Sequence, residues 1–205
     1  MAADSLTAMS QSFLVHWAKP RLELLKKRGE VGTALTMMYG SPHGSAPSLK
    51  RYGVSVGDAL YIVGVAAGRL SLVTRAEVAS LISADEYFRA HLKLPATLLK
   101  LHLWSLEERL GEERPELGHR LPFGCVDEAA LFSSATPVIL DRFIPTHVVG
   151  ALRFRTKKGE ERALPLEDGL LKKLVALQGH LHRLTPETAP LLDRLLAADG
   201  SKKAK

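Results

Sequence analysis

Cysteine and long apolar runs are scarce in this 205-residue chain. The single cysteine, Cys125, excludes an intramolecular disulfide and suits a reducing compartment. No apolar run approaches the roughly 18 residues that a membrane-spanning helix needs. Residues 1–17 also lack the basic segment and following apolar segment of a secretory signal. We therefore expect a soluble, cytoplasmic protein that makes no membrane contact.

The composition is that of a globular protein. Hydrophobic residues make up 46% of the chain, which is enough to bury a sizeable core. A length of 205 residues fits one domain, or one domain with a substantial appendage.

Positive charge is concentrated in the first 76 residues. This part contains nine Lys and Arg side chains against four acidic ones, whereas residues 77–200 contain sixteen basic and eighteen acidic ones. The last five residues add three lysines, and the formal net charge of the chain is +6. Such an asymmetry is a hint of a polyanionic partner, and a basic, solvated face without a partner explains so small a surplus equally well.

The stretch from residue 52 to residue 82 is the centre around which the chain is organised. It contains a turn at Gly57-Asp58, an apolar run over Ala59–Val65, a reversal over Ala66–Arg69 and a second apolar run over Leu70–Val73. Two apolar runs joined by a short loop that contains glycine predict a β-hairpin. The stretch has no catalytic signature, so residue chemistry alone does not state a function.

Strands and helices are also predicted on both sides of this hairpin. Ser12–Trp17 has the composition of a strand, and Pro20 suits the first turn of a helix over Arg21–Arg28. Val31–Tyr39 is a further candidate strand, and a capping-box pattern predicts a helix over Ala84–Lys93.

The last third of the chain is predicted to contain a hairpin and helices. Leu152–Leu164 predicts a second hairpin, preceded by a strand at Val138–Leu140 and a short helix from Pro145 to Val149. Apolar positions at helical spacing predict an amphipathic helix over Glu167–Gln178, and a last helix is predicted within Thr188–Ala197.

These elements predict an α+β fold, which we interpret as a small β-barrel with packed helices and a C-terminal helical extension. The predicted division has three parts. A barrel domain with inserted helices covers residues 12–165, C-terminal helices pack on it over 166–198, and a disordered basic tail follows over 199–205.

Three segments resemble a known superfamily. Phe13–Trp17 is an aromatic-rich strand, Val54–Asp58 gives a Val-x-x-Gly-Asp entry to a barrel strand, and Leu72–Val78 matches the returning strand. This pattern, over residues 12–82, resembles the PUA-like superfamily and within it the EVE, ASCH and YTH group. The sequence departs from the EVE pattern at Gly64–Ala66, where an aromatic-His-Ser segment would stand.

The resemblance implies a module without a cofactor that recognises RNA, or a modified base in DNA, and performs no chemistry on it. Such a module needs aromatic faces for an unstacked base and cations for the phosphates. Four aromatic residues are candidate stacking platforms and four cations are candidate phosphate contacts: Trp17, Tyr39, Tyr52 and Tyr61, with Lys50, Arg51, Arg69 and Arg75.

Each candidate also has a structural explanation. Trp17 and Tyr61 lie in apolar strand patterns and suit a core, and Arg69 and Arg75 suit solvated strand ends. Lys50-Arg51 is the strongest of the set, because it follows a loop rich in Gly, Ser and Pro.

Catalytic chemistry is a weaker interpretation. Cys125 could pair with His119 or His147, but a lone cysteine is usually a small core residue. His180 and His182 lack a third metal ligand at a clear spacing and suit a polar turn after a helix.

Acidic residues give the remaining catalytic alternative. Asp127, Glu128 and Asp141 could serve a metal-dependent nuclease, although adjacent acids before Ala129 more often mark a helix start. The loop Gly40–Ser48 lacks the ending of a phosphate-binding loop.

A protein partner is the main alternative to a nucleic acid. An accessory subunit could dock through the leucines of the C-terminal segments, which otherwise form an intramolecular core: Leu170, Leu171, Leu174, Leu191, Leu192, Leu195 and Leu196.

Overall fold

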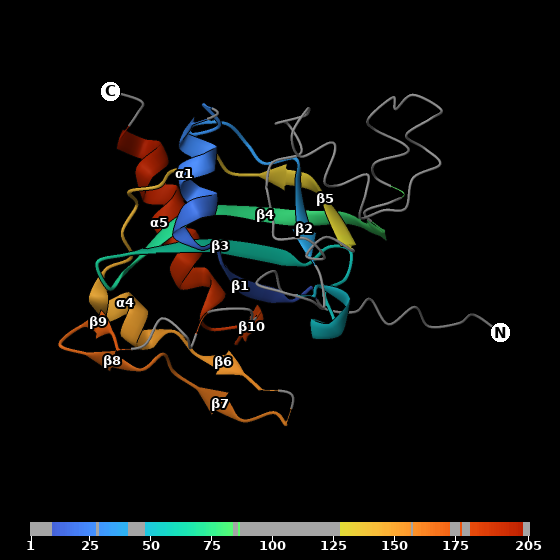
Figure 1. Ribbon diagram of the computed structural model, residues 1–205. Coiled ribbons are helices and arrows are strands. Elements are labelled where there is room, and N and C mark those ends of the chain that lie inside the picture. Colours follow the sequence, from blue (N-terminus) through green and yellow to red (C-terminus); the bar gives the residue numbers. More distant parts are fainter. Residues whose placement is uncertain are drawn as a thin grey trace.

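A mixed sheet forms the centre of the computed structural model (Figure 1). The structure describes residues 10–27, 29–40, 48–83, 86, 128–156, 158–172, 177 and 181–202. In these ranges the sheet has the strand order β2-β5-β4-β3-β1-β10-β6-β7. Its strands are β1 (Ser12–His16), β2 (Met37–Gly40), β3 (Ala59–Ala66), β4 (Arg69–Ser83), β5 (Glu128–Ala135), β6 (Phe154–Arg155), β7 (Glu161–Arg162) and β10 (Leu181–Leu184).

The α+β class is confirmed, but the closed barrel is not found. Within the described ranges β2 pairs with β5 alone and β7 with β6 alone, so the sheet has two open edges. Both edge strands are short, at four and two residues, and offer little backbone for closure. Register shifts beside Val78 interrupt the pairing of β4 with β5, and bulges of this kind bend a strand without closing the sheet.

The central hairpin is confirmed, with a tighter turn than the sequence indicated. Strands β3 and β4 pair antiparallel from Ala59↔Glu77 to Ala66↔Arg69. The turn residues Ala67 and Gly68 have φ values of 48° and 72°. Positive φ at both central positions is the backbone of a type I′ turn, whose twist matches that of paired strands.

The Val-x-x-Gly-Asp segment fastens the start of this hairpin. The carboxylate of Asp58 accepts hydrogen bonds from the backbone N–H groups of Gln11 at 2.7 Å and Ser55 at 2.8 Å. The N–H of Gly57 donates to the carbonyl of Val78 at 2.8 Å, and glycine suits this position because its φ is 86°. The motif therefore has a structural role here.

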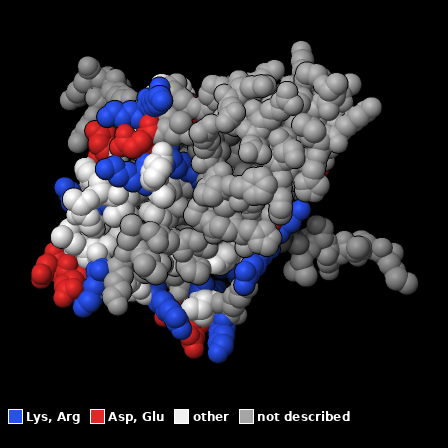
Figure 2. Space-filling model, viewed as in Figure 1, with Lys and Arg blue, Asp and Glu red and all other residues white. Residues whose placement is uncertain are grey.

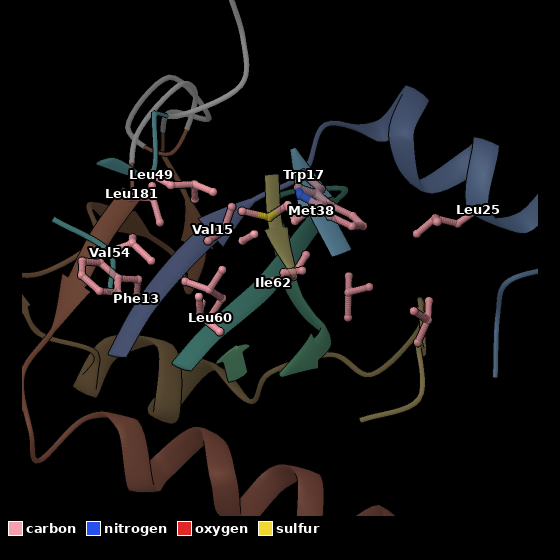
Figure 3. Close-up of a cluster of buried hydrophobic side chains, with 14 residues drawn as sticks. Phe13, Val15, Trp17, Leu25, Met38, Leu49, Val54, Leu60, Ile62 and Leu181 are labelled. Atoms are coloured by element: carbon pink, nitrogen blue, oxygen red, sulfur yellow. The ribbon is translucent and has the colours of Figure 1, made fainter. Parts of the chain in front are cut away.

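Alternate residues of the central strands enter two different cores. Leu60 and Ile62 of β3 belong to a first cluster, shown in Figure 3, that also contains Leu25 of α1 (Lys19–Lys27). Tyr61 and Val63 belong to a second cluster on the opposite face. This second cluster receives side chains from α4 (Thr146–Ala151) and α5 (Ala189–Lys202). Helices thus cover both faces of the central strands.

Several predicted elements are confirmed. Strand β1 and helices α1 and α4 match the predicted segments, and so do the β6–β7 hairpin and the last helix, α5. The predicted strand over Val31–Tyr39 is shorter than expected and corresponds to β2. Val138–Leu140 is not a strand; an isolated bridge at Pro137 precedes it. The predicted helix over 84–93 lies outside the described residues except for Glu86.

The prediction of an amphipathic helix over residues 167–178 is wrong for residues 167–172, the first part of this range, which the structure describes. Strands β8 (Leu166–Glu167) and β9 (Leu170–Leu171) form a hairpin there. Its turn, Asp168-Gly169, has φ values of 50° and 77°, again a type I′ geometry. Asp-Gly is a strong hairpin signal, and here it prevails over the helical spacing of the leucines.

Strand β10 was also missed by the sequence interpretation. It runs between β1 and β6 and pairs antiparallel with both. The sequence assigns His182 to a polar turn after a helix, but the residue lies within strand β10. The three-part division of the chain stays a prediction. Within the described ranges, each helix is too short or too polar to cross a bilayer.

Candidate nucleic-acid interface

The strongest predicted site residues lie on one short helical turn, η1 (Lys50–Tyr52). Lys50 and Arg51 are exposed on it, and Tyr52 is half-buried. Leu49, directly before the turn, and Val54, two residues after it, are both buried in the first core cluster (Figure 3). The turn is thus anchored at both ends, while its two cations face solvent.

Glu128 fastens this turn from the start of strand β5. Its Oε1 accepts a hydrogen bond from the hydroxyl of Ser48 at 2.9 Å. Its Oε2 accepts from the backbone N–H groups of Leu49 at 2.6 Å and Lys50 at 3.2 Å. Glu128 is buried, and these donors explain how its carboxylate is accommodated. The interpretation of Glu128 as part of a helix start is therefore wrong.

A cavity of about 430 Å³ lies beside Tyr52. We call it the β10 cavity, because three consecutive residues of that strand line it. Its lining residues are Phe13, Tyr52, Phe154, Arg155, Thr156, Arg162, Ala163, Leu164, Pro165, Leu181, His182 and Arg183. Its size falls in the range of about 300–1,000 Å³ that is usual for sites of small molecules and cofactors.

Aromatic rings and guanidinium groups both contribute to this lining. The Arg183 guanidinium carbon is 5.8 Å from the ring centre of Phe13, its register partner on β1. The rings of Phe154 and His182 meet edge to face, with 5.0 Å between their centres. Phe13 and Phe154 are themselves buried, at 1% and 5% exposure, so the flat surfaces that the cavity offers are the half-buried rings of Tyr52 and His182. The arginines beside them are donors that suit anionic oxygens.

Three arginines gather where β10, β6 and β7 pair. Arg183 lies directly opposite Arg155, and like charges at such a cross-strand position destabilise a sheet. Arg162 lines the same cavity and makes an exposed ion pair with Glu160 at 3.2 Å. Glu161 stands opposite Arg155 on β7 and offsets part of the charge. A bound anion would relieve the repulsion between the two opposed arginines.

The surface around these elements carries both signs of charge. In Figure 2, Lys and Arg side chains lie in the lower part of the molecule, where Figure 1 labels β6 and β7, and also at the upper left, near α1. Acidic side chains lie among them. Among the described side chains of this face, both signs of charge are therefore mixed.

The other predicted aromatic platforms are buried. Trp17, Tyr39 and Tyr61 are exposed by 1%, 2% and 1%. Trp17 packs in the first cluster and Tyr61 in the second. This burial favours the core explanation for these side chains and leaves Tyr52 as the predicted aromatic residue that reaches the β10 cavity.

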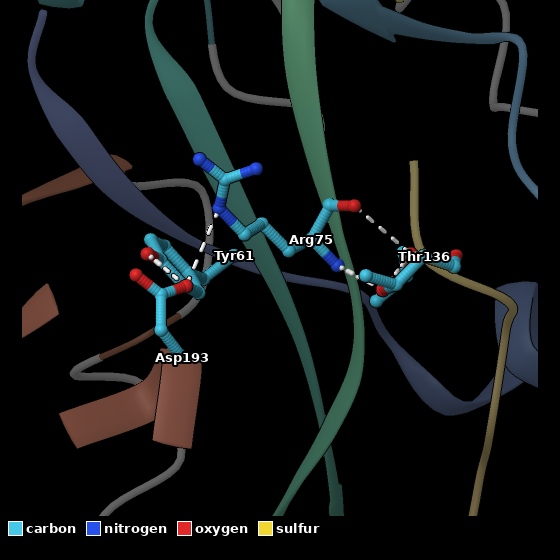
Figure 4. Close-up of polar contacts among 5 residues, drawn as sticks. Tyr61, Arg75, Thr136 and Asp193 are labelled. Carbon is cyan, nitrogen blue, oxygen red and sulfur yellow. Dashed lines mark hydrogen bonds and ion pairs between the residues drawn. The ribbon is translucent and has the colours of Figure 1, made fainter. Parts of the chain in front are cut away.

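Arg75 joins the sheet to the last helix. Its Nε lies 3.4 Å from Oδ1 of Asp193, the same oxygen that accepts a 2.8 Å hydrogen bond from the hydroxyl of Tyr61 (Figure 4). Burial and this hydrogen bond raise the pKa of Tyr61 to about 12. The guanidinium of Arg75 therefore already has an anionic neighbour within the chain.

Arg69 lies at the first residue of β4, away from the β10 cavity lining. Its guanidinium carbon is 4.3 Å from the ring centre of Phe143, which is a cation–π distance. The structure thus brings together Lys50, Arg51 and Tyr52, and places Arg69 and Arg75 with other partners.

Comparison with solved structures returns ASCH proteins from Zymomonas mobilis. The crystal structure of ASCH from this organism has a TM-score of 0.33 and 12% identity, covering 82% of this chain and 96% of that one. A tyrosine-to-phenylalanine mutant has a TM-score of 0.33 and 10% identity, covering 82% and 99%. A serine-to-alanine mutant has 0.34 and 11%, covering 82% and 96%. These structures are of the ASCH group that the sequence resembles.

No family model matches the chain, and no curated protein does.

Residues considered for catalysis are dispersed or lie outside the described ranges. Cys125, His119, Asp127 and His180 are outside them. His147 and Asp141 are exposed at separate positions. Among the residues that the structure describes, no three His, Cys, Asp or Glu side chains are placed to hold a metal ion.

The C-terminal leucines are divided between core and surface. Leu192 is fully buried, and Leu195 and Leu196 pack against the second cluster. Leu170 is 43% exposed, and Leu174 lies outside the described residues.

The sequence interpretation missed most of the cavity lining. Phe154 and Arg155 stand in the alternating pattern of the predicted second hairpin, so they could have been considered. His182 is considered in the sequence only as a metal ligand, and Arg183 gives no signal there, because the strand that carries both is not predicted.

Proposed function

We propose that this protein binds nucleic acid, either RNA or DNA that contains a modified base, and performs no chemistry on it. The observation that carries the proposal is the β10 cavity, with its aromatic and arginine lining, beside the exposed cations of η1. The cavity would receive an unstacked base, while Lys50 and Arg51 would contact the phosphates of the neighbouring nucleotides.

The chemistry of the lining suits such a ligand. A base that stacks on an aromatic side chain gains about 1–3 kcal/mol. Tyr52 and His182 are half-buried and offer ring surface in the cavity, while the buried Phe154 supports the His182 ring by its edge-to-face contact. Arginine can also donate two parallel hydrogen bonds to a phosphate, and Arg155, Arg162 and Arg183 are the donors of this kind here.

Fluorescence anisotropy with labelled oligonucleotides tests the proposal. Single-stranded and duplex RNA and DNA would be titrated with the protein at low and moderate salt. We expect binding that weakens as salt rises, because displaced counterions are the main driving term of phosphate contacts. Modified-base DNA would be compared with its unmodified counterpart, which separates the two ligand classes.

A pair of charge-reversal variants locates the site. Lys50→Glu/Arg51→Glu should abolish the salt-sensitive binding. Lys26→Glu/Lys27→Glu makes the same change of net charge at the end of α1 and should retain most of it. Equal losses in both variants would indicate a diffuse electrostatic attraction, and no binding of any oligonucleotide by the wild type would refute the proposed function.

A further inference from the structure

We propose that Glu128 is a positioning residue of the interface, which fixes η1 so that Lys50 and Arg51 face the ligand and Tyr52 lines the β10 cavity. The inference rests on the proposed function. It assigns to a buried acid a contribution to the binding of a polyanion, although its charge has the unfavourable sign.

The hydrogen bonds of Glu128 and Ser48 together hold the backbone N–H groups at the start of η1. The carboxylate accepts from the Ser48 hydroxyl and from the backbone N–H groups of Leu49 and Lys50. The Ser48 oxygen in turn accepts from the N–H of Arg51 at 3.1 Å. The first N–H groups of a helical turn have no partner inside it, and here one carboxylate and one hydroxyl supply the acceptors.

Apart from the burial of Leu49 and Val54 in the first core cluster, the turn has little support from its own sequence. Residue Leu49, at its N-cap, provides no side-chain hydrogen bond, and the turn is three residues long. Short helical turns of this type are marginal alone. The acceptor for the turn comes from strand β5, about 80 residues later in the chain. The position of η1 is therefore set by the sheet.

The last residue of the turn, Tyr52, lines the β10 cavity. Gly53 has a φ of 75° and ends the turn, and its N–H donates to the carbonyl of Lys50 at 3.0 Å. A Cβ atom at Gly53 would lie 3.6 Å from a guanidinium nitrogen of Arg183. The turn and the arginine of β10 are thus in direct proximity. A shift of η1 would move Tyr52 relative to Arg183.

Removal of the Glu128 carboxylate distinguishes a positioning role from a purely electrostatic effect, because the two predict opposite changes in oligonucleotide affinity. Glu128→Ala makes the protein more positive, so an electrostatic effect alone would strengthen oligonucleotide binding. A positioning role instead predicts weaker binding, by about tenfold, which corresponds to roughly 1.4 kcal/mol. The slope of log affinity against log salt should also become shallower, because fewer phosphates are contacted.

Asp193→Ala is the matched control. It also removes one hydrogen-bonded carboxylate, but this one lies on α5 and bonds to Tyr61, a residue of the second core cluster. We expect this variant to bind the oligonucleotide at least as tightly as the wild type. Glu128→Gln should recover most of the affinity that Glu128→Ala loses, because its amide can accept from the backbone and donate to Ser48.

The outcomes are distinguishable. Unchanged or tighter binding by folded Glu128→Ala, with salt-sensitive binding by the wild type, would overturn the inference and leave the proposed function intact. No binding by the wild type would remove both. If Glu128→Ala does not fold, Ser48→Ala decides: weaker binding supports positioning, and unchanged affinity and salt slope refute it. Circular dichroism and thermal unfolding establish which variants are folded.

Discussion

The hydroxyl of Tyr61 donates a 2.8 Å hydrogen bond to Oδ1 of Asp193, 132 residues later in the chain. Tyr61 is a core residue of strand β3, and Asp193 is on the last helix, α5. Arg75 lies 3.4 Å from the same carboxylate oxygen. One acid thereby connects α5 to two neighbouring strands and fixes the helix on the sheet (Figure 4).

The contribution of this contact can be measured by a double-mutant cycle. Tyr61→Phe and Asp193→Ala should each lower the free energy of unfolding by about 1–2 kcal/mol, and the double variant by less than their sum. Urea unfolding of the four proteins gives the coupling energy, expected at about 1 kcal/mol. Asp141→Ala, an exposed acid, serves as the control and should change stability by less than about 0.5 kcal/mol. Additive effects in the cycle would argue against a direct contact.

The raised pKa of Tyr61 predicts a loss of stability at high pH. Burial and Asp193 raise this pKa to about 12, whereas the ordinary value of 10.0 applies to the unfolded chain. Between these values the unfolded state releases its proton and the folded state keeps it, so stability falls as pH rises from about 10 to about 12. Below pH 10 this contribution is complete.

Urea unfolding of the wild type and Tyr61→Phe at several alkaline pH values checks the sign. The difference in unfolding free energy between the two proteins should shrink as pH rises through this range. Tyrosinate absorbance of the folded proteins should show one late-titrating group that the variant lacks. Equal pH dependence of the two proteins would contradict the raised pKa.

The turn of the central hairpin can be improved. Ala67 has a φ of 48°, a left-handed value that costs a residue with a Cβ about 1–2 kcal/mol. Ala67→Asn creates the Asn-Gly pair that favours type I′ turns, and should stabilise the protein by about 0.5–1 kcal/mol in thermal unfolding. Ala66→Gly, one residue earlier within β3, should instead destabilise it. A loss of stability in Ala67→Asn would show that the turn has another geometry.

The contrast between the two hairpin turns explains what the sequence could predict. The β3–β4 hairpin joins two apolar runs across Ala67-Gly68, so the pattern of apolar residues and the turn residues both indicate a hairpin. At Asp168-Gly169 the two signals disagree: the leucines around the turn repeat at helical spacing, whereas Asp-Gly indicates a hairpin turn. The structure follows the turn, since two residues with positive φ cannot continue a right-handed helix. Local turn chemistry was the more reliable signal.

The candidate site was predictable only where its residues are adjacent in sequence. Lys50, Arg51 and Tyr52 lie together on η1, and a charged segment beside a loop could be recognised. The β10 cavity combines residues from β1, β10 and the β6–β7 hairpin. This combination depends on the placement of β10 between β1 and β6, which is a long-range pairing that no local pattern encodes.

The arginines of the β6–β7 hairpin should affect binding more than equally exposed cations elsewhere. Arg155 and Arg162 line the β10 cavity, whereas Lys26 and Lys27 lie in the last turn of α1. We expect Arg155→Gln/Arg162→Gln to weaken single-strand binding and to lower the salt slope by about 1.4, or roughly 0.7 for each phosphate that the variant no longer neutralises. Lys26→Gln/Lys27→Gln changes the net charge equally and should leave the slope near the wild-type value. Anisotropy titrations across a salt series measure both slopes, and equal slopes for the two variants would place the interface away from the β10 cavity.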